Sequence, residues 1–122
     1  PPRTRRRFVT YKAFDVVVVP FPFTDRAASK RRPALVLSDA DAFGAKVAQS
    51  VLAMITSAAH SDWPLDAAIT DLKSAGLPSP SIVRMKLFTL DHQLILRKAG
   101  SLGAKDRETV ARCVRRLLKP VL

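Results

Sequence analysis

The chain has 122 residues, of which 21 are Lys or Arg and 10 are Asp or Glu, so its formal net charge is +11. This length suits one domain, and the 48% hydrophobic content excludes a disordered basic tail. No apolar run approaches the roughly 20 residues of a membrane-spanning helix, and no apolar leader segment follows the basic start, so we expect no secretory signal. The single cysteine, Cys113, excludes an internal disulfide and is typical of a reducing cytoplasm.

The positive charge is concentrated at the two ends of the chain. Residues 1–12 carry five basic residues and no acid, and residues 97–122 carry eight basic residues against two acids. Residues 13–96 carry eight of each and are neutral. Such ends attract polyanions, so RNA, DNA and anionic membranes are candidate partners. The alternative is that these basic segments only keep the protein soluble.

After a flexible basic arm over residues 1–12, the pattern predicts a single domain over residues 13–122 built mainly from short strands. Four consecutive valines within residues 15–23 favour a strand buried on both faces, which Pro20 and Pro22 must end or confine to an edge. The rest of the domain reads as a polar loop (24–32), a strand (33–38), a turn (39–46), a strand (49–57), a weak strand (65–70), a turn near Gly76, a strand (81–90) and a last strand (92–97).

The C-terminal segment changes to a helical period. Between residues 110 and 118 apolar side chains recur at helical spacing, and arginines occupy the opposite side. We expect Gly103 to cap this helix, Asp106 to lie in its first turn and Pro120 to stop it. Together the elements predict a mainly β fold: a small half-open barrel of about five or six strands with a helix packed on it.

Cationic side chains next to strands are the first candidates for a binding site. Lys30, Arg31 and Arg32 are adjacent and precede a strand, where guanidinium groups can donate paired hydrogen bonds to a phosphate. The alternative is a solvated loop face. Arg84 and Lys86 share one face of the 81–90 strand, so Arg84 either pairs with an acid or lines a groove.

Hydroxyl and imidazole groups give weaker signals. Thr56 and Ser57 end the 49–57 strand, where hydroxyls either bond the local backbone or contact a ligand. His60 and His92 could act together as acid and base, although each follows a strand in a polar context, where an exposed turn histidine is the commoner explanation. The sequence has no glycine-rich phosphate loop, no HExxH motif and no clustered carboxylates. Metal catalysis is therefore disfavoured, and we expect no metal and no cofactor.

Four blocks of the sequence, taken together, resemble one protein family. They are DVVVVPFPFTD (15–25), KRRPALVLS (30–38), VLAMITS (51–57) and VRMKLFTLD (83–91). Their order and spacing, followed by a terminal helix, resemble the MazF/PemK toxins of bacterial type II toxin–antitoxin modules from about Asp15 to Leu118. The resemblance implies an SH3-like β-barrel with a C-terminal helix. It also implies a cytoplasmic homodimer that is neutralised by a small acidic antitoxin.

The resemblance further implies a metal-independent endoribonuclease, an mRNA interferase that cuts single-stranded RNA at short sequences. In that family the 2′-hydroxyl attacks the adjacent phosphorus and leaves a 2′,3′-cyclic phosphate and a 5′-hydroxyl. The family's arginine before proline falls on Arg32 and its block-ending threonine falls on Thr56, so these are the expected catalytic residues. Arg32 would stabilise charge and Thr56 would position the phosphate. The expected RNA contacts are Lys30, Arg31, Ser57, Arg84 and Lys86.

Two other functions remain open from the sequence. A toxin of the same fold could act on DNA gyrase without cutting RNA. A non-catalytic basic module that binds RNA or DNA is favoured by the composition alone. RNA cleavage, gyrase supercoiling and duplex DNA binding are the measurements that separate the three functions.

Overall fold

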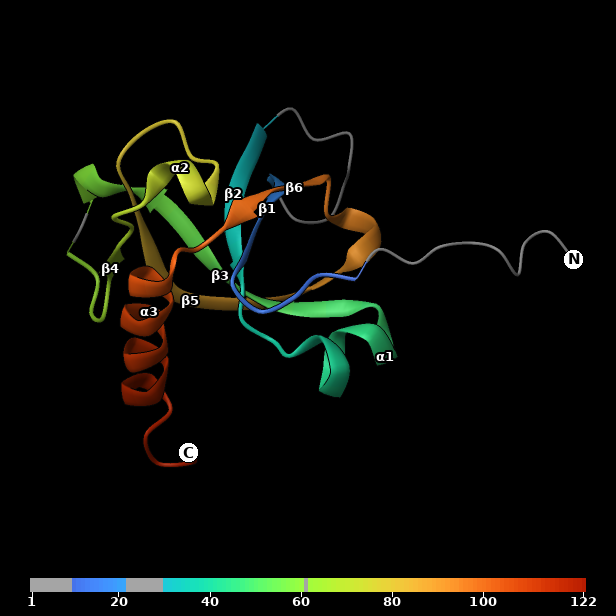
Figure 1. The fold of residues 1–122 in the computed structure, drawn as a ribbon. Coiled ribbons are helices and arrows are strands. Elements are labelled where there is room, and N and C mark those ends of the chain that lie inside the picture. Colours follow the sequence, from blue (N-terminus) through green and yellow to red (C-terminus); the bar gives the residue numbers. More distant parts are fainter. Residues whose placement is uncertain (1–9, 22–29, 61) are drawn as a thin grey trace, which may run out of the picture.

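The computed structural model describes residues 10–21, 30–60 and 62–122, and for His60 the backbone only. The predicted arm up to residue 9 and the predicted loop over residues 24–29 lie outside these residues, as does Pro22. In the described part six strands form one antiparallel sheet, in the order β4 (Ala67–Ala68), β5 (Ser81–Asp91), β3 (Gln49–Ser57), β2 (Lys30–Val36), β1 (Asp15–Phe21) and β6 (Arg97–Ser101). The sheet curls into a half-barrel, and a C-terminal helix packs against it (Figure 1). The predicted mainly β fold is therefore confirmed.

The elements follow the chain with short connections. The strands are β1 (Asp15–Phe21), β2 (Lys30–Val36), β3 (Gln49–Ser57), β4 (Ala67–Ala68), β5 (Ser81–Asp91) and β6 (Arg97–Ser101). The helices and helical turns are η2 (Ala40–Gly44), α1 (Ala45–Val47), η3 (Ala58–His60), α2 (Leu72–Ala75), η4 (His92–Leu94) and α3 (Ala104–Leu117). None of the helices in the described ranges is long and apolar enough to cross a membrane.

The valine-rich strand β1 is buried on both faces, as its sequence predicts. Val16 belongs to one apolar cluster, which includes Ile55 of β3 and Val110 of α3. Val17 and Val19 belong to a second cluster. Because neighbouring side chains on a strand point to opposite faces, the two clusters lie on opposite sides of the sheet. The helix α3 therefore covers the side of the first cluster.

Several predicted boundaries were wrong because local side-chain caps and pairing decide them. Lys30, Arg31 and Arg32 belong to β2 rather than to a loop, since they pair with the end of β1. The last strand is β6, not residues 92–97, of which residues 92–94 form a 3-10 turn. The carboxylate of Asp91 caps this turn by accepting a hydrogen bond from the Gln93 N–H at 2.8 Å.

Two helical segments were not predicted: η2 with α1 lies in the predicted turn over residues 39–46, and α2 lies just before the turn predicted near Gly76. The Asp39 carboxylate caps η2 by accepting from the Ala42 N–H at 2.7 Å, and η2 continues into α1. The Asp71 carboxylate caps α2 by accepting from the Ser74 N–H at 3.0 Å. The caps satisfy backbone donors that a helix start otherwise leaves unpaired. The aspartates at the N-cap positions, Asp39 and Asp71, were thus the sequence signal for both helices.

The helix α2 packs with its backbone against the backbone of β6. A Cβ atom at Gly76 would overlap the Ala99 carbonyl oxygen, and a Cβ at Gly100 would overlap the Ser74 carbonyl oxygen. Gly76 also has a φ of 71°, the left-handed conformation that ends α2. Only glycine fits at these two contacts.

Replacing Gly76 with alanine is expected to lower the free energy of unfolding by about 3 kcal/mol or more. The left-handed backbone alone costs an L-residue roughly 1–2 kcal/mol, and the overlap with Ala99 adds the cost of overpacking. The matched control is Gly44→Ala, because Gly44 has a φ of −59° and its added Cβ would meet no atom closer than 3.5 Å. Urea unfolding of both variants measures the difference; equal stabilities would contradict this account of Gly76.

The helix α3 begins at Ala104 after Gly103, the predicted cap, and ends at Leu117, before Pro120. Asp106 lies in its first turn as predicted, but its carboxylate is buried, with 2% of the residue exposed. It accepts hydrogen bonds from the Thr70 hydroxyl at 2.7 Å, the Thr70 N–H at 3.0 Å and the Asp71 N–H at 2.9 Å. Asp106 therefore ties α3 to the segment that leads from β4 into α2.

Candidate functional site

The strand register brings Arg32, Thr56 and Arg84 to one face of the sheet. Ala34 of β2 pairs with Met54 of β3, and Met54 pairs with Arg84 of β5, so all three point to the same side. Arg32 and Thr56 each lie two residues beyond the Ala34–Met54 pair, on the same face, because side chains repeat every second residue. We call the surface formed by Arg32, Thr56 and Arg84 the cationic face.

The cationic face points away from α3. Ile55 and Val83, which directly precede Thr56 and Arg84, pair with each other and belong to the cluster that α3 covers. The residues that follow them therefore point to the opposite side of the sheet. The helix leaves this end of β3 and β5 uncovered.

Arg32 lies near the start of β2, where its positive charge is available to a ligand. It pairs with Val19, and its guanidinium carbon lies 4.9 Å from the centroid of the Phe21 ring. This cation–π contact orients the side chain without neutralising it. In the part of the chain that the structure describes, Arg32 forms no ion pair with a carboxylate. An anion is therefore a fitting partner for this guanidinium.

The two hydroxyls at the end of β3 differ. The Ser57 hydroxyl accepts a hydrogen bond from the Ala59 N–H at 3.3 Å, so it bonds the local backbone. Thr56 is half-buried and pairs with Ile82, and its hydroxyl forms no hydrogen bond within the described ranges. The Ser57 hydroxyl thus has a local backbone partner and keeps its O–H to donate to a ligand, whereas the Thr56 hydroxyl has no hydrogen-bond partner among the described residues.

Arg84 pairs with an acid, as one of its two sequence interpretations predicted. Its Nε lies 3.2 Å from Asp66 Oδ1 and its Nη2 lies 2.9 Å from Asp66 Oδ2. The hydrogen bond to Asp66 raises the pKa of Arg84 above its ordinary value, helped by the charges of Asp66 and Asp62. Arg84 is therefore a fixed cation rather than a proton acceptor.

Trp63 and Asp66 were not predicted as site residues, and the structure places both beside Arg84. The Trp63 ring centroid lies 5.6 Å from the Arg84 guanidinium carbon and 5.3 Å from the Lys86 Nζ. Asp66 is 18 positions from Arg84, so spacing gave no signal for the pair. For Trp63 the available signal was an isolated tryptophan in a loop.

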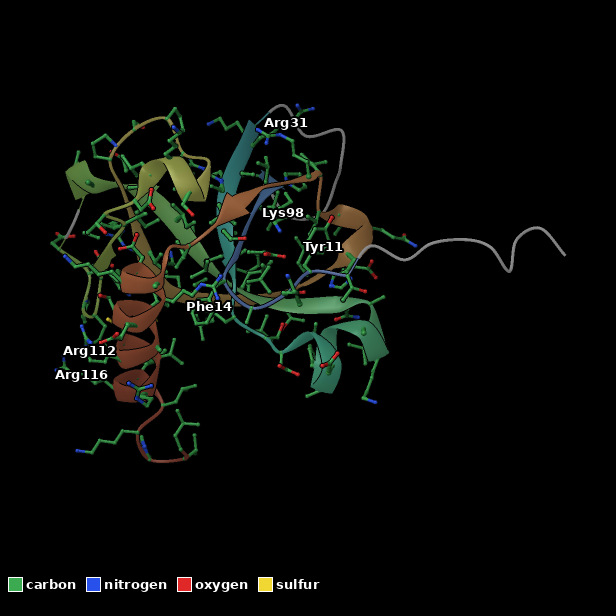
Figure 2. The ribbon with its side chains drawn as sticks, viewed as in Figure 1. Tyr11, Phe14, Arg31, Lys98, Arg112 and Arg116 are labelled. Atoms are coloured by element: carbon green, nitrogen blue, oxygen red, sulfur yellow. The ribbon has the colours of Figure 1, made fainter. Side chains whose placement is uncertain are left out.

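Arg31 and Lys30 extend the positive surface beyond the cationic face. Arg31 lies one residue from Arg32, so it points to the other side of β2, and it lines a cavity of about 480 Å³ together with Arg97 and Leu77. Arg32 borders the same cavity, but its guanidinium lies over Phe21. Figure 2 shows Arg31 at the end of β2, well separated from Arg112 and Arg116 on α3.

His92 is held at the other end of β3. Its Nε2 lies 2.7 Å from the hydroxyl of the buried Ser50, and its ring packs edge-on against Tyr11 at 5.2 Å. Ser50 and Thr56 are six residues apart on β3, which is about 20 Å. His92 therefore lies far from the cationic face, and the side chain of His60 is outside the described atoms.

Among the described residues no group of three His, Cys, Asp or Glu side chains could hold a metal ion.

The chemistry available at the cationic face is that of a phosphate site. Arg32 offers a guanidinium that has no carboxylate partner among the described residues, Thr56 offers a hydroxyl, and Arg84 offers a protonated guanidinium that Asp66 holds in place. Donors and charges of this kind stabilise the extra negative charge that develops on a phosphate during its transfer. The structure thus brings the two predicted catalytic residues to the same face, with Arg84 on the neighbouring strand.

Known proteins of the same fold include toxins and toxin–antitoxin complexes. A MazE–MazF complex from Deinococcus radiodurans superposes with a TM-score of 0.69 at 21% identity, over 90% of this chain and 96% of that chain. An endoribonuclease in complex with its cognate antitoxin from a Mycobacterial species gives 0.69 at 13% identity, over 90% and 94%. The Mycobacterium tuberculosis toxin MazF-mt6 gives 0.68 at 18% identity, over 86% and 96%. These likenesses show a shared fold.

Comparison of sequences identifies the family directly. No curated protein matches the chain by sequence search. Residues 12–118, however, match the model of the PemK-like, MazF-like toxins, which covers nearly the whole domain from β1 to α3. The resemblance in the four sequence blocks is therefore confirmed, and the chain belongs to the PemK-like, MazF-like toxins of type II toxin–antitoxin systems.

Proposed function

We propose that this toxin is a metal-independent endoribonuclease that cleaves single-stranded RNA at short sequences. The observation that carries the proposal is that Arg32, which has no carboxylate partner among the described residues, and Thr56 lie on the same face of the sheet, opposite the face that α3 covers. Family membership supports it, and so does the endoribonuclease of the same fold from a Mycobacterial species.

In the proposed reaction the 2′-hydroxyl of one nucleotide attacks the adjacent phosphorus. A bond forms between O2′ and phosphorus, and the bond from phosphorus to O5′ breaks. The products are a 2′,3′-cyclic phosphate and a 5′-hydroxyl, so the proton lost from O2′ is balanced by the one gained at O5′. Substrates must be RNA because DNA lacks the nucleophile.

Arg32 and Thr56 have separate roles in this reaction. Arg32 donates hydrogen bonds to the non-bridging oxygens as their negative charge grows, and Thr56 positions the phosphate. Arginine keeps its proton at neutral pH because its pKa exceeds about 12, so Arg32 is assigned to charge stabilisation and not to proton removal. The remaining cations and hydroxyl predicted from the sequence bind the RNA strand on either side: Lys30, Arg31, Ser57, Arg84 and Lys86.

We further propose that the toxin works as a homodimer in the cytoplasm and is neutralised by a small acidic antitoxin. The acidic partner would cover the cationic face and compete with RNA for Arg32 and Arg84. Two of the similar structures are toxin–antitoxin complexes, which supports such a partner.

Cleavage of a mixed-sequence RNA in the presence of EDTA tests the proposed activity. We expect fragments with 2′,3′-cyclic phosphate and 5′-hydroxyl ends, and no cleavage of a matched oligonucleotide with a 2′-deoxy position at the mapped site. A requirement for added Mg²⁺ would contradict metal independence. Intact RNA together with inhibited gyrase supercoiling would favour the gyrase-directed alternative, and specific duplex DNA binding alone would favour the non-catalytic one.

Neutralising the basic arm is expected to weaken the attraction of RNA while sparing the reaction itself. Changing Arg3, Arg5, Arg6 and Arg7 to glutamine removes charge outside the proposed catalytic segment. The slope of log affinity against log salt should become shallower by about 0.7 for each phosphate that the arm no longer neutralises. Salt titrations of binding and cleavage rates at saturating RNA measure the two effects. Loss of cleavage at saturating RNA would show that the active site includes the arm.

A further inference from the structure

We propose that Trp63 forms a stacking subsite for a nucleobase of the substrate, at the border of the cationic face. The inference rests on the proposed RNA substrate and assigns the groups that would hold one base beside the reacting phosphate.

A tight turn fixes the position of Trp63. The Trp63 carbonyl accepts a hydrogen bond from the Asp66 N–H at 3.3 Å, which closes a four-residue turn. Pro64 occupies the second position and Leu65, with a φ of 63°, the third, which is the pattern of a type II turn. Glycine is usual at that third position, but the Leu65 side chain packs against the apolar core. The core contact therefore holds a turn that sets Trp63 and Asp66 in a defined relation.

Two cations accompany the exposed indole. Trp63 is 42% exposed, and both the Arg84 guanidinium and the Lys86 ammonium lie within 6 Å of its ring centroid. Asp66, at the end of the same turn, binds Arg84 through two hydrogen bonds and so fixes one of the cations. An aromatic surface flanked by positive charges is the arrangement that binds single-stranded nucleic acid, whose bases stack while its phosphates contact the cations.

The strand register places this subsite next to the predicted catalytic pair. Thr56 pairs with Ile82, and Arg84 lies two residues further along β5 on the same face. Thr56 and Arg84 are thus diagonal neighbours, a relation that separates Cα atoms by about 7–8 Å. A base stacked on Trp63 therefore belongs to a nucleotide close to the phosphate held by Arg32 and Thr56. An exposed tryptophan could also anchor an acidic peptide, but alternating cationic and aromatic groups match the alternating phosphates and bases of RNA.

Intrinsic fluorescence can test the proposal because Trp63 is the only tryptophan in the chain. The full chain is titrated with a short single-stranded RNA in which every 2′-hydroxyl is methylated, so that it binds without being cleaved. Anisotropy of a labelled copy of this RNA measures binding independently. We expect the indole emission to be quenched with the same midpoint as the anisotropy change.

Substitutions at Trp63 give the second arm of the test. Trp63→Ala should weaken RNA binding by roughly 5- to 150-fold and raise KM with little change in kcat. Trp63→Phe should retain most of the affinity because it keeps an aromatic surface. Phe43→Ala is the matched control: Phe43 is 36% exposed and belongs to η2, next to the start of β3 and away from Thr56. Circular dichroism checks that each variant is folded.

The outcomes separate this inference from the proposed function. Binding by anisotropy without quenching, or equal affinities for wild type and a folded Trp63→Ala, would overturn the stacking subsite while leaving RNA cleavage intact. Quenching by an acidic peptide and not by RNA would assign Trp63 to a protein partner and overturn it as well. Absence of any RNA binding would overturn both proposals together.

Discussion

Replacing Arg32 with alanine is expected to slow RNA cleavage at saturating enzyme by about 10²- to 10³-fold. This is the usual loss when one donor to a developing negative charge is removed. Arg32 is suited to that role because it stands on the cationic face, is held over Phe21 and forms no carboxylate pair within the described ranges. Arg32→Lys should recover little of the rate, since an ammonium cannot donate two parallel hydrogen bonds from a fixed plane. Single-turnover rates with a labelled RNA measure both effects.

Arg31→Ala is the matched control for Arg32. It removes the same charge one residue away, but Arg31 points to the other side of β2, whereas the Arg32 guanidinium lies over Phe21. We expect weaker RNA binding and an almost unchanged single-turnover rate. If the two alanine variants lost the rate equally, the local charge and not the geometry of Arg32 would explain the activity.

Replacing Asp106 with alanine is expected to cause the largest loss of stability, about 3–5 kcal/mol at pH 7. The change removes the buried carboxylate that accepts from the Thr70 N–H and hydroxyl and from the Asp71 N–H, and hydrogen bonds to charged groups contribute about 1.5–3 kcal/mol each. The link from α3 to the segment before α2 would be lost at the same time. Glu108→Ala, which removes an exposed acid two residues further along α3, should cost less than about 0.5 kcal/mol.

The stabilisation by Asp106 should depend on pH in a defined direction. Burial of the Asp106 carboxylate raises its pKa, but hydrogen bonds from Asp71 and Thr70 and the charge of Lys105 outweigh burial and lower the pKa below 3.8. Because the unfolded chain binds the proton more tightly, this stabilisation is present above about pH 4 and is lost as the pH falls through the lowered pKa. Denaturant unfolding at pH 7 and pH 3 should therefore show a smaller acid effect in Asp106→Ala than in wild type. An equal acid effect in both would contradict the lowered pKa.

Local sequence patterns were enough to predict the strands that form the core. The valines of β1 predicted burial on both faces, and the helical spacing after residue 110 predicted α3. The last strand was misplaced because the apolar residues within 92–97 pack into the core from a turn and do not form a strand. Ile95 is buried next to the turn η4, whereas β6 contains lysine and glycine and is a strand only because it pairs with β1. The apolar pattern predicts which side chains are buried, but it does not predict which backbone segments form hydrogen bonds in the sheet.

The candidate site could be predicted in part. The resemblance pointed to Arg32 and Thr56, and the register of β2 and β3 brings them to one face. The partner of Arg84 could not be predicted, because Asp66 lies 18 positions away in the sequence. It comes close to Arg84 only because β4 pairs with β5. The same holds for Trp63, whose place beside the cations depends on the left-handed backbone of Leu65.

The two neighbouring arginines of β2 show that charge and chemistry can be adjusted independently in this toxin. The side chain at position 31 can be replaced without moving the Arg32 guanidinium, because successive side chains of a strand point to opposite faces of the sheet. Inserting a single residue between Arg32 and Pro33 would have the reverse effect, since it would carry both arginines to exchanged faces while leaving the net charge unaltered. Counting basic residues would not detect such a change, although it would move the Arg32 guanidinium away from the proposed phosphate site.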